Sequence, residues 1–575
     1  MPKILKTILK VTSIVVLVLL SIYYFYFELP FRGTPFRASI HGVLPLTPRW
    51  ALECWLWEDD DNTAERVDTL LQGYAKYDIP VRTILLDSPW SLRYDDFEVD
   101  TILYPNPAEW FAKLKNDGYR IVLWMTTMVN SRSNDTRIKE SADWFNYAKE
   151  KGYLLGNGLQ IKWWKGRGGF IDYTNPEALA WRQGMQQQVY DLGIDGWKLD
   201  GTATLMRSSF GPIPMLYTTS HQGIMTTRKY MNHYYRNEYF HGLTQNPEFV
   251  TMSRSYDRAF HPEGFAPFDA APVTWVGDQT HTWDEKQGLQ MAMRHIMKSA
   301  KIGYNIIGSD IGGFAGGKHI PPHLYIRWAQ FSTFCGFFLN GGHGERALWK
   351  RTREELEIIR KFSWLHTELV PYMYSYVVTA HQGGALLQRP VKKGKYHYLF
   401  GDDFLIAPIY KDELTNQVHL PKGKWRYFFD DQEVIQGPKQ FERDFPLDEY
   451  PVYIREGAII PMDIKRDYTG IGDINSEGFT TLLIYPDGRN SFRLYHSGTE
   501  STLISTDDNK EKLIVKIEGK QIPHILHIKM SGKPQKVELD GISLSDGKDY
   551  IFDQKKNRLI VTIKTYQSGQ YVIFK

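Results

Sequence analysis

The chain has 575 residues, more than one ordinary domain holds, so about two to four domains are expected. A formal net charge of +3 gives no support to a nucleic-acid partner, and two cysteines, Cys54 and Cys335, are too few for a disulfide framework or a cysteine-based metal site. Aromatic residues reach 14% of the composition, which fits either carbohydrate binding or the packing of a β-rich protein.

The first informative segment is apolar and follows three lysines. Lys3, Lys6 and Lys10 precede the uncharged run 11–27, which is near the minimum length for a membrane span. No small-residue cleavage site follows, so residues 1–30 are interpreted as a membrane anchor, with a cleaved signal peptide as the alternative. An anchor would leave the lysines in the cytoplasm and the rest of the chain outside it, in the periplasm, at the cell surface or in a lumen. Cleavage would give a secreted protein.

Between residues 48 and 385, short apolar runs alternate with segments of helical pattern, which predicts βα units and a parallel sheet. There are eight such runs, and this number favours a closed (β/α)8 TIM barrel. The runs are 50–57, 81–86, 120–124, 195–199, 249–253, 273–277, 304–308 and 334–339.

Helices are predicted between the runs. The apolar spacing of 67–74 predicts a helix with Asn62 as its N-cap. The pattern of residues 107–117 predicts a second helix, which ends at Gly118. A third helix is predicted to reach Leu192.

Beyond about residue 385 the helical periodicity ends. Short alternating strands, separated by Gly, Pro and Asp turns, continue to the C-terminus. Residues 386–465 are therefore interpreted as a proximal β-sandwich and residues 466–575 as a distal β-sandwich.

In a closed parallel barrel, the active site lies at the carboxyl ends of the strands. Polar or aromatic side chains follow most of the runs at that point. They are Asp87, Trp124, Asp200, Arg254, Asp278, Asp310 and, a little beyond the last run, His343. A single polar residue after a strand is usually an ordinary loop residue, but their repetition around one rim favours a sugar-binding pocket.

Two of these acids suit the hydrolysis of a glycosidic bond with retention, which needs two carboxyl groups about 5 Å apart. Asp200 follows the run 195–199, and the nearby cation of Lys198 would keep it ionised as the nucleophile. Asp278 follows the apolar Trp275 and is interpreted as the acid/base, which must hold a proton at the start. Two structural strand-end aspartates are the alternative.

Several segments resemble glycoside hydrolase family 31, the retaining α-glycosidases, between residues 48 and 500. Trp197-Lys-Leu-Asp200 resembles the family's nucleophile strand, and Trp275-Val-Gly-Asp278 resembles its acid/base segment. Gly308-Ser-Asp-Ile-Gly-Gly-Phe314 resembles a sugar-binding segment. Further matches are Asp87 with Asp96-Phe97, Trp164-Lys-Gly, 172–176, Ser253-Arg254-Ser255, 401–408 and 453–461.

The resemblance implies a set of substrate-binding residues: Asp87, Trp124, Trp164, Trp197, Lys198, Arg254, Trp275, Asp310, Phe314 and His343. His343 stands in for the histidine of the family's Arg-x-His segment, whose arginine has no clear match here. The family usually carries a β-sandwich before the barrel. Only residues 28–47 separate the apolar run from the barrel, so we expect no such domain.

We therefore expect a membrane-tethered retaining α-glycosidase that releases a terminal α-linked galactose, glucose or xylose from an oligo- or polysaccharide through a covalent glycosyl-aspartate. The alternatives are a catalytically silent carbohydrate-binding or scaffold protein on the same barrel, and a transglycosidase. No cofactor, metal or nucleic-acid partner is expected. The sequence leaves open whether the chain forms a homo-oligomer.

Overall fold

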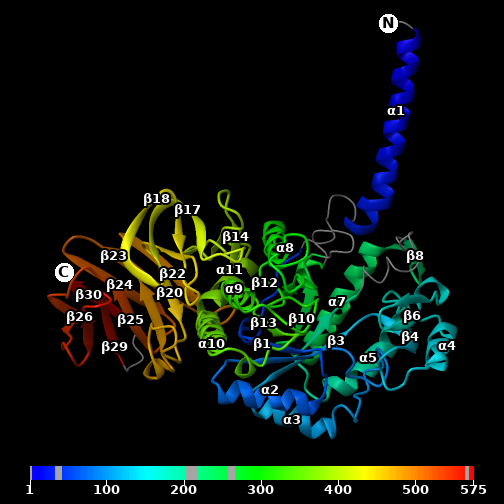
Figure 1. Ribbon diagram of the computed structural model, residues 1–575, viewed down its shortest axis with the longest axis horizontal. Coiled ribbons are helices and arrows are strands. Elements are labelled where there is room, and N and C mark those ends of the chain that lie inside the picture. The colour runs from blue at the N-terminus through cyan, green and yellow to red at the C-terminus, as the bar shows by residue number, and fades with distance from the viewer. Residues whose placement is uncertain (1–2, 33–41, 202–216, 257–265, 564–568) are drawn as a thin grey trace. The chain divides into compact units, whose positions relative to one another are not determined.

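The computed structural model describes residues 3–32, 42–201, 217–256, 266–563 and 569–575, and Figure 1 labels its elements. The chain divides into two compact units. The first unit comprises Met1–Val43, Asn62–Ala64 and Leu85–Pro272. The second unit comprises Leu44–Asp61, Glu65–Ile84 and Val273–Lys575.

The N-terminal apolar run is helical. Helix α1 (Lys3–Tyr23) continues into the π-helical η1 (Tyr24–Arg32), and no residue of α1 is buried. The stretch Lys3–Pro30 is long and apolar enough to cross a membrane, a property that a signal sequence shares.

All eight predicted runs contribute to one eight-stranded sheet, whose strand order is β12-β11-β10-β7-β3-β2-β1-β13. β7 pairs in parallel with both β3 and β10. A parallel bridge between Asp310, just after β12, and Leu339 of β13 joins the two ends of this order, so the sheet is barrel-like as predicted. The strands are β1 (Trp55–Glu58), β2 (Thr83–Leu86), β3 (Arg120–Met125), β7 (Gly196–Leu199), β10 (Val250–Arg254), β11 (Val273–Trp275), β12 (Ile307–Gly308) and β13 (Leu339–Gly341).

Helices follow the strands as the alternation predicts. The side chain of Asn175 accepts a hydrogen bond from the Glu177 amide at 3.0 Å and so caps the third predicted helix. The helices are α2 (Ala64–Lys76), α3 (Pro107–Asn116), α4 (Ala142–Glu150), α5 (Pro176–Tyr190), α7 (Thr227–Gln245), α8 (Leu289–Ile302), α9 (Pro322–Thr333), α10 (Arg353–Glu368) and α11 (Val370–His381). The first unit also holds a small sheet of β4 (Met128–Ser133), β5 (Ile161–Trp163) and β6 (Gly166–Phe170), and a hairpin of β8 (Tyr217–Ser220) and β9 (Gly223–Thr226).

Two predictions need correction. Of the eighth run, only Leu339 lies in a strand. Helix α9 extends to Thr333, and residues 334–338 form a buried connection that reaches the sheet at its end, where the Phe338 carbonyl accepts from the Trp55 amide at 3.0 Å. The buried side chain of Asn62 makes no hydrogen bond with any residue that the structure describes, so it does not cap α2.

The C-terminal region is made of β-sheets, as predicted. Its first part has six strands hydrogen-bonded in the order β14-β15-β16-β19-β17-β18. These strands are β14 (Gln388–Pro390), β15 (Tyr398–Phe400), β16 (Phe404–Ile406), β17 (Thr415–Tyr427), β18 (Asp430–Asp444) and β19 (Val452–Arg455).

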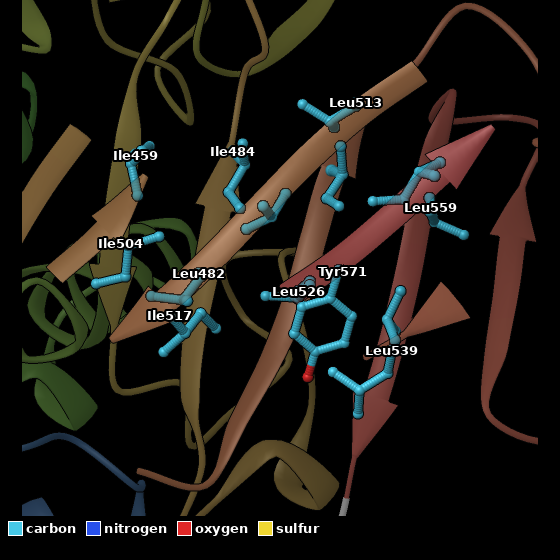
Figure 2. Packing of buried hydrophobic residues seen from close by; sticks show 14 of the residues in the cluster. Ile459, Leu482, Ile484, Ile504, Leu513, Ile517, Leu526, Leu539, Leu559 and Tyr571 are labelled. Carbon is cyan, nitrogen blue, oxygen red and sulfur yellow. The ribbon is translucent and has the colours of Figure 1, made fainter. Parts of the chain in front are cut away.

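The last part of the chain has two sheets that share one apolar core. Leu482 and Leu526 from one sheet belong to the same buried cluster as Ile504 and Ile517 from the other (Figure 2). One sheet contains β20 (Ile459–Met462), β21 (Thr480–Ile484), β25 (His524–Lys529), β29 (Arg558–Ile563) and β28 (Tyr550–Asp553). The other contains β22 (Arg489–Tyr495), β23 (Ser501–Asp508), β24 (Lys512–Gly519), β30 (Gly569–Phe574), β26 (Lys536–Leu539) and β27 (Ile542–Ser543).

Candidate active site at the strand ends

Asp200 lies at the carboxyl end of β7, a strand whose four residues are all buried. Its backbone amide donates to the Met125 carbonyl at 3.1 Å and so extends the parallel pairing with β3. Oδ1 accepts hydrogen bonds from the Gly201 amide at 2.7 Å and from Arg254 Nε at 3.3 Å. Oδ2 accepts from Trp124 Nε1 at 3.3 Å. Three predicted site residues, Asp200, Arg254 and Trp124, are therefore in contact.

The electrostatic surroundings of Asp200 favour its ionised form. Burial alone would raise the pKa of this carboxyl, but the positive charges of Arg254 and Lys198, together with the hydrogen bonds from Gly201 and Trp124, outweigh it. The pKa of Asp200 is accordingly lowered below its ordinary value. Of the two cations, Arg254 has the larger effect on the pKa of Asp200, and Lys198, the cation that the sequence pointed to, has the smaller one.

Lys198 and Asp87 are also brought together. Lys198 Nζ donates to Asp87 Oδ2 at 2.7 Å, and both side chains are buried. Because side chains alternate along a strand, Lys198 lies on the same face of β7 as Asp200, and Trp197 lies on the other. Trp197 is fully buried there and donates from Nε1 to Tyr190 Oη at 2.9 Å. The structure thus places Trp197 in the packing between β7 and α5, apart from the other predicted site residues.

A series of aromatic contacts leads from Trp124 to the surface of the first unit. Trp124 contacts Tyr94 with ring centroids 5.8 Å apart, and Tyr94 contacts Trp163 at 5.3 Å. Trp163 in turn contacts Trp164 at 5.2 Å. Trp164 is exposed in the turn between β5 and β6, and the other three rings link it to Trp124 beside Asp200.

A buried polar network, which sequence reasoning missed, supports the backbone just after Trp124. Arg182 of α5 donates to the Thr126 carbonyl at 2.7 Å and to Glu238 Oε1 at 2.8 Å. Asp95 Oδ1 accepts from the Thr126 amide at 3.3 Å, and burial raises the pKa of Asp95 to about 7. No motif pointed to these residues, because their partners come from helices and loops far apart in the sequence.

In the second unit, Asp278 follows β11 with a left-handed backbone, at φ 68°. Its amide donates to Asp310 Oδ2 at 3.3 Å. At Gly277 a Cβ atom would lie 2.2 Å from Trp275 Nε1 and 3.3 Å from Asp310 Oδ2, so a larger residue would force Trp275 away. This strand end therefore brings Trp275, Asp278 and Asp310 together.

Arg346 holds the loop that follows Asp310. Its Nη1 and Nη2 atoms donate to the carbonyls of Ile311, at 2.5 Å, and Gly313, at 2.6 Å. Burial lowers the pKa of this guanidinium, and the neighbouring Tyr325 and the carboxylate of Asp310 oppose that shift. Arg346 was not predicted, because the resemblance places an arginine two residues before the histidine, whereas Arg346 follows His343 by three.

Phe314 and His343, the two remaining predicted residues, form part of an aromatic stack. The Phe314 ring centroid is 4.3 Å from that of His343 and 5.5 Å from that of Trp57. His343 Nδ1 lies 2.5 Å from Asp60 Oδ1, and Nε2 lies 3.2 Å from Asp59 Oδ2. Both nitrogens of the half-buried ring thus face carboxylates of the connection between β1 and α2, which fix its orientation.

A cavity of about 970 Å³ lies elsewhere in the second unit. Trp283, Arg327, Leu414 and Leu447 contribute to its lining, which includes none of the predicted site residues. In the part of the chain that the structure describes, no group of three or more His, Cys, Asp or Glu side chains is arranged to hold a metal ion.

Two family models match the chain in succession. The model described as "Glycosyl hydrolases family 31 TIM-barrel domain" covers residues 44–376. The model described as "Glycosyl hydrolase family 31 C-terminal domain" covers residues 378–460.

Similar curated proteins include glycosidases and a transferase. An alpha-xylosidase of Emericella nidulans is 26% identical over 455 residues, which are 75% of this chain and 55% of the relative. Alpha-glucosidase 2 of Bacillus thermoamyloliquefaciens is 25% identical, over 91% of this chain and 68% of the relative. An isomaltosyltransferase of Sporosarcina globispora is 25% identical, over 83% of this chain and 48% of the relative. The chain thus spans only about half to two thirds of the length of these relatives.

Solved structures share the fold. A dextranase of Flavobacterium johnsoniae in complex with glucose superposes with a TM-score of 0.80 at 22% identity, covering 93% of this chain and 72% of that chain. A cycloalternan-forming enzyme of Listeria monocytogenes in complex with a pentasaccharide gives a TM-score of 0.78 at 21% identity, over 93% of this chain and 55% of that chain.

Proposed function

The chain belongs to glycosyl hydrolase family 31, and from this premise we propose that it is a retaining α-glycosidase. It releases a terminal α-linked sugar from an oligo- or polysaccharide. The alpha-xylosidase and alpha-glucosidase relatives favour xylose or glucose, with galactose as a third candidate.

The environment of Asp200 carries this proposal. A nucleophile must be ionised when substrate arrives, and the cations of Arg254 and Lys198 lower the pKa of Asp200 despite its burial. The hydrogen bonds from Trp124 and Gly201 also fix the carboxylate at the strand end, which restricts its approach to the anomeric carbon.

Asp278 is proposed as the acid/base. In the first step, Asp200 forms a bond to the anomeric carbon while Asp278 donates its proton to the leaving glycosidic oxygen. In the second step, Asp278 takes a proton from water, whose oxygen bonds to the same carbon and releases Asp200. Two displacements at one carbon return the α configuration.

The other strand-end groups are proposed to bind the sugar. The Asp87 and Asp310 carboxylates suit hydroxyl groups as hydrogen-bond acceptors, and Lys198 and Arg254 add donors. The rings of Trp124, Trp275 and Phe314 offer apolar faces to the sugar ring. His343, whose ring is held by two carboxylates, supplies a further polar contact. The proposal omits Trp197, because its ring is fully buried on the other face of β7.

The decisive test replaces each proposed catalytic acid. Asp200→Ala and Asp278→Ala should each lower turnover of aryl α-glycosides by about 10⁴-fold or more on the best substrate. Asp143→Ala, on the exposed surface of α4, is the matched control and should retain activity. NMR of the wild-type reaction should show that the released sugar is first formed as the α anomer, before mutarotation. Unimpaired turnover in either variant, or a β product, would refute the assignment.

Transglycosylation is a second candidate, favoured by the similarity to an isomaltosyltransferase. In that reaction a sugar hydroxyl replaces water in the second step, so Asp278 deprotonates the acceptor instead. Chromatography of products with and without added acceptor sugars distinguishes the two. Glycan binding without turnover across a panel of p-nitrophenyl α-glycosides would instead favour a silent binding protein.

We also propose that α1 is an uncleaved membrane anchor. The three lysines at its start and its unburied apolar surface support this location. Membrane fractionation and N-terminal sequencing test it, because a mature chain beginning near residue 28 would mean that the segment is a cleaved signal.

A further inference from the structure

The end of the proposed anchor is attached to a surface hairpin of the first unit. η1 follows α1 directly and contacts α7 and β9. The Tyr217 hydroxyl of β8 donates to the Phe25 carbonyl of η1 at 2.7 Å. Figure 1 shows that the end of α1 nearest the first unit lies on the side where α7 and β8 are labelled. The anchor and the hairpin are therefore joined by a specific contact.

One face of the hairpin β8–β9 is exposed and partly apolar. Thr219 pairs with Ile224, so Tyr217, Thr219 and Ile224 share a face, and Thr218 and Met225 share the opposite one. Ile224 is 77% exposed, whereas Met225 is 1% exposed. The hairpin is thus well packed on its inner side, and its outer face presents a large aliphatic side chain to the surroundings.

The distance from the apolar span to this face is short. Helix α1 has 21 residues and is about 31 Å long, which matches the hydrocarbon thickness of a bilayer. Phe25 lies two residues after Tyr23, the last residue of α1, and two residues extend over at most about 7 Å. Exposed Tyr23 and Tyr24 mark that end of the helix, and tyrosine is enriched where membranes meet water.

The same hairpin belongs to the connection that follows the proposed nucleophile. Asp200 ends β7, and the hairpin immediately precedes α7, the next helix described. The His221 amide at the hairpin turn donates to the buried Asp172 carboxylate at 2.6 Å, which ties the turn to the body of the first unit. The anchor contact at Tyr217 and the turn at His221 thus both come between β7 and α7 in the sequence.

We infer that the outer face of hairpin β8–β9 rests on the lipid surface beside α1, and that the Asp200 site acts on α-linked sugars carried by lipids of that membrane. The inference rests on the anchor and the glycosidase activity proposed above. Ile224 enters the headgroup boundary, where burial of its side chain is favourable. The tether holds Asp200 close to the lipid surface and raises the local concentration of glycans attached there.

Fluorescence on the full chain in phosphatidylcholine/phosphatidylglycerol vesicles tests the lipid contact without an activity assay. Ile224→Cys is labelled with an environment-sensitive fluorophore, and Ile542→Cys is the matched control, because Ile542 is 71% exposed in the last β region. The native Cys54 and Cys335 are buried and should not react in the folded protein. Label at 224 should shift to the blue and be quenched by spin-labelled lipid, while label at 542 should do neither. Equal behaviour at both positions, or failure of the chain to enter vesicles, would overturn the inference.

Kinetics test the substrate class. Ile224→Asp should lower turnover of an alkyl α-glycoside embedded in vesicles several-fold and leave turnover of a soluble aryl α-glycoside unchanged. Ile542→Asp should change neither rate. Equal rates for Ile224→Asp and wild type on the embedded substrate would refute lipid-linked glycans as substrates. If the wild type turns over neither substrate, the glycosidase proposal is refuted. The fluorescence result would still decide whether the hairpin contacts the lipid.

Discussion

Lys198 and Asp87 form a buried ion pair, in which Nζ lies 2.7 Å from Oδ2 and the two side chains are 5% and 6% exposed. Lys198 precedes Asp200 by two residues on the same face of β7. Its single charge therefore has two effects: it compensates Asp87 directly, and after Arg254 it is the second cation that offsets the burial of Asp200 and lowers the pKa of that carboxyl.

The first prediction concerns this pair. Lys198→Met should leave Asp87 buried without its cation and lower the free energy of unfolding by about 3–5 kcal/mol. Lys198→Met combined with Asp87→Asn should recover part of the loss, because no uncompensated charge remains. Urea unfolding followed by tryptophan fluorescence measures both. If Lys198→Met alone is as stable as wild type, water must reach the Asp87 carboxylate in that variant.

The second prediction concerns the pH dependence of the reaction. Arg254→Met removes the stronger cation beside Asp200, so the pKa of Asp200 should rise and the acid limb of kcat/KM should move to higher pH. In wild type, the pKa of Asp200 is lower in the folded chain than in the unfolded chain, and this difference stabilises the fold. The stabilisation is complete at pH values above the unfolded pKa and is lost as the pH falls through the folded pKa. That contribution should shrink in the variant. An unchanged acid limb would mean that another group sets it.

The third prediction concerns the buried network behind Trp124. Burial raises the pKa of Asp95 to about 7, so the folded chain keeps a proton that the unfolded chain loses near pH 4. The free energy of unfolding should therefore fall as pH rises from about 4 to 7. Asp95→Asn should reduce this slope, and exposed Asp143→Asn should not. Denaturant unfolding at several pH values measures the slope, and identical slopes in all three proteins would contradict the prediction.

The fourth prediction concerns Arg346. Arg346→Met should release the carbonyls of Ile311 and Gly313 and disorder the loop beside Asp310. We expect kcat/KM to fall by about 10²-fold, because small displacements of binding groups have effects of that size. Arg353→Met is the control, because Arg353 is 88% exposed and forms its ion pair with Glu357 of the same helix. This variant should keep the stability and the kcat/KM of wild type, because exposed ion pairs contribute little. A normal kcat/KM in the Arg346 variant would assign it a structural role alone.

The barrel was predictable because its strands are short apolar runs that end in polar residues. Run 195–199 fell within one residue of β7, and the same alternation placed Lys198 beside Asp200. The prediction for Trp197 came from motif resemblance and went against the alternation, which puts its ring on the opposite face. For β13, the apolar residues 334–338 were as buried as a strand, so hydrophobicity could not separate the connection from the pairing.

Contacts between distant segments were not predictable. Arg182, Glu238 and Asp95 meet only when helices α5 and α7 pack near the end of β3, and charged residues in a sequence ordinarily predict exposure. Arg346 was equally hidden, because it follows the glycine-rich turn 341–344 in the sequence but binds the carbonyls of Ile311 and Gly313, more than 30 positions earlier. The contacts of His343 with Asp59 and Asp60 were not predictable either, because they join residues more than 280 positions apart in the sequence.

β7 is also fixed at its other end. Fully buried Asp195, just before the strand, accepts hydrogen bonds from Lys115 at 2.6 Å, Arg120 at 2.9 Å and the Ile121 amide at 2.9 Å. A strand held at both ends and paired on both sides cannot open locally. Its amide protons should therefore exchange with deuterium only when the first unit unfolds as a whole, and the slow-exchanging amides of β7 would report the global stability of that unit.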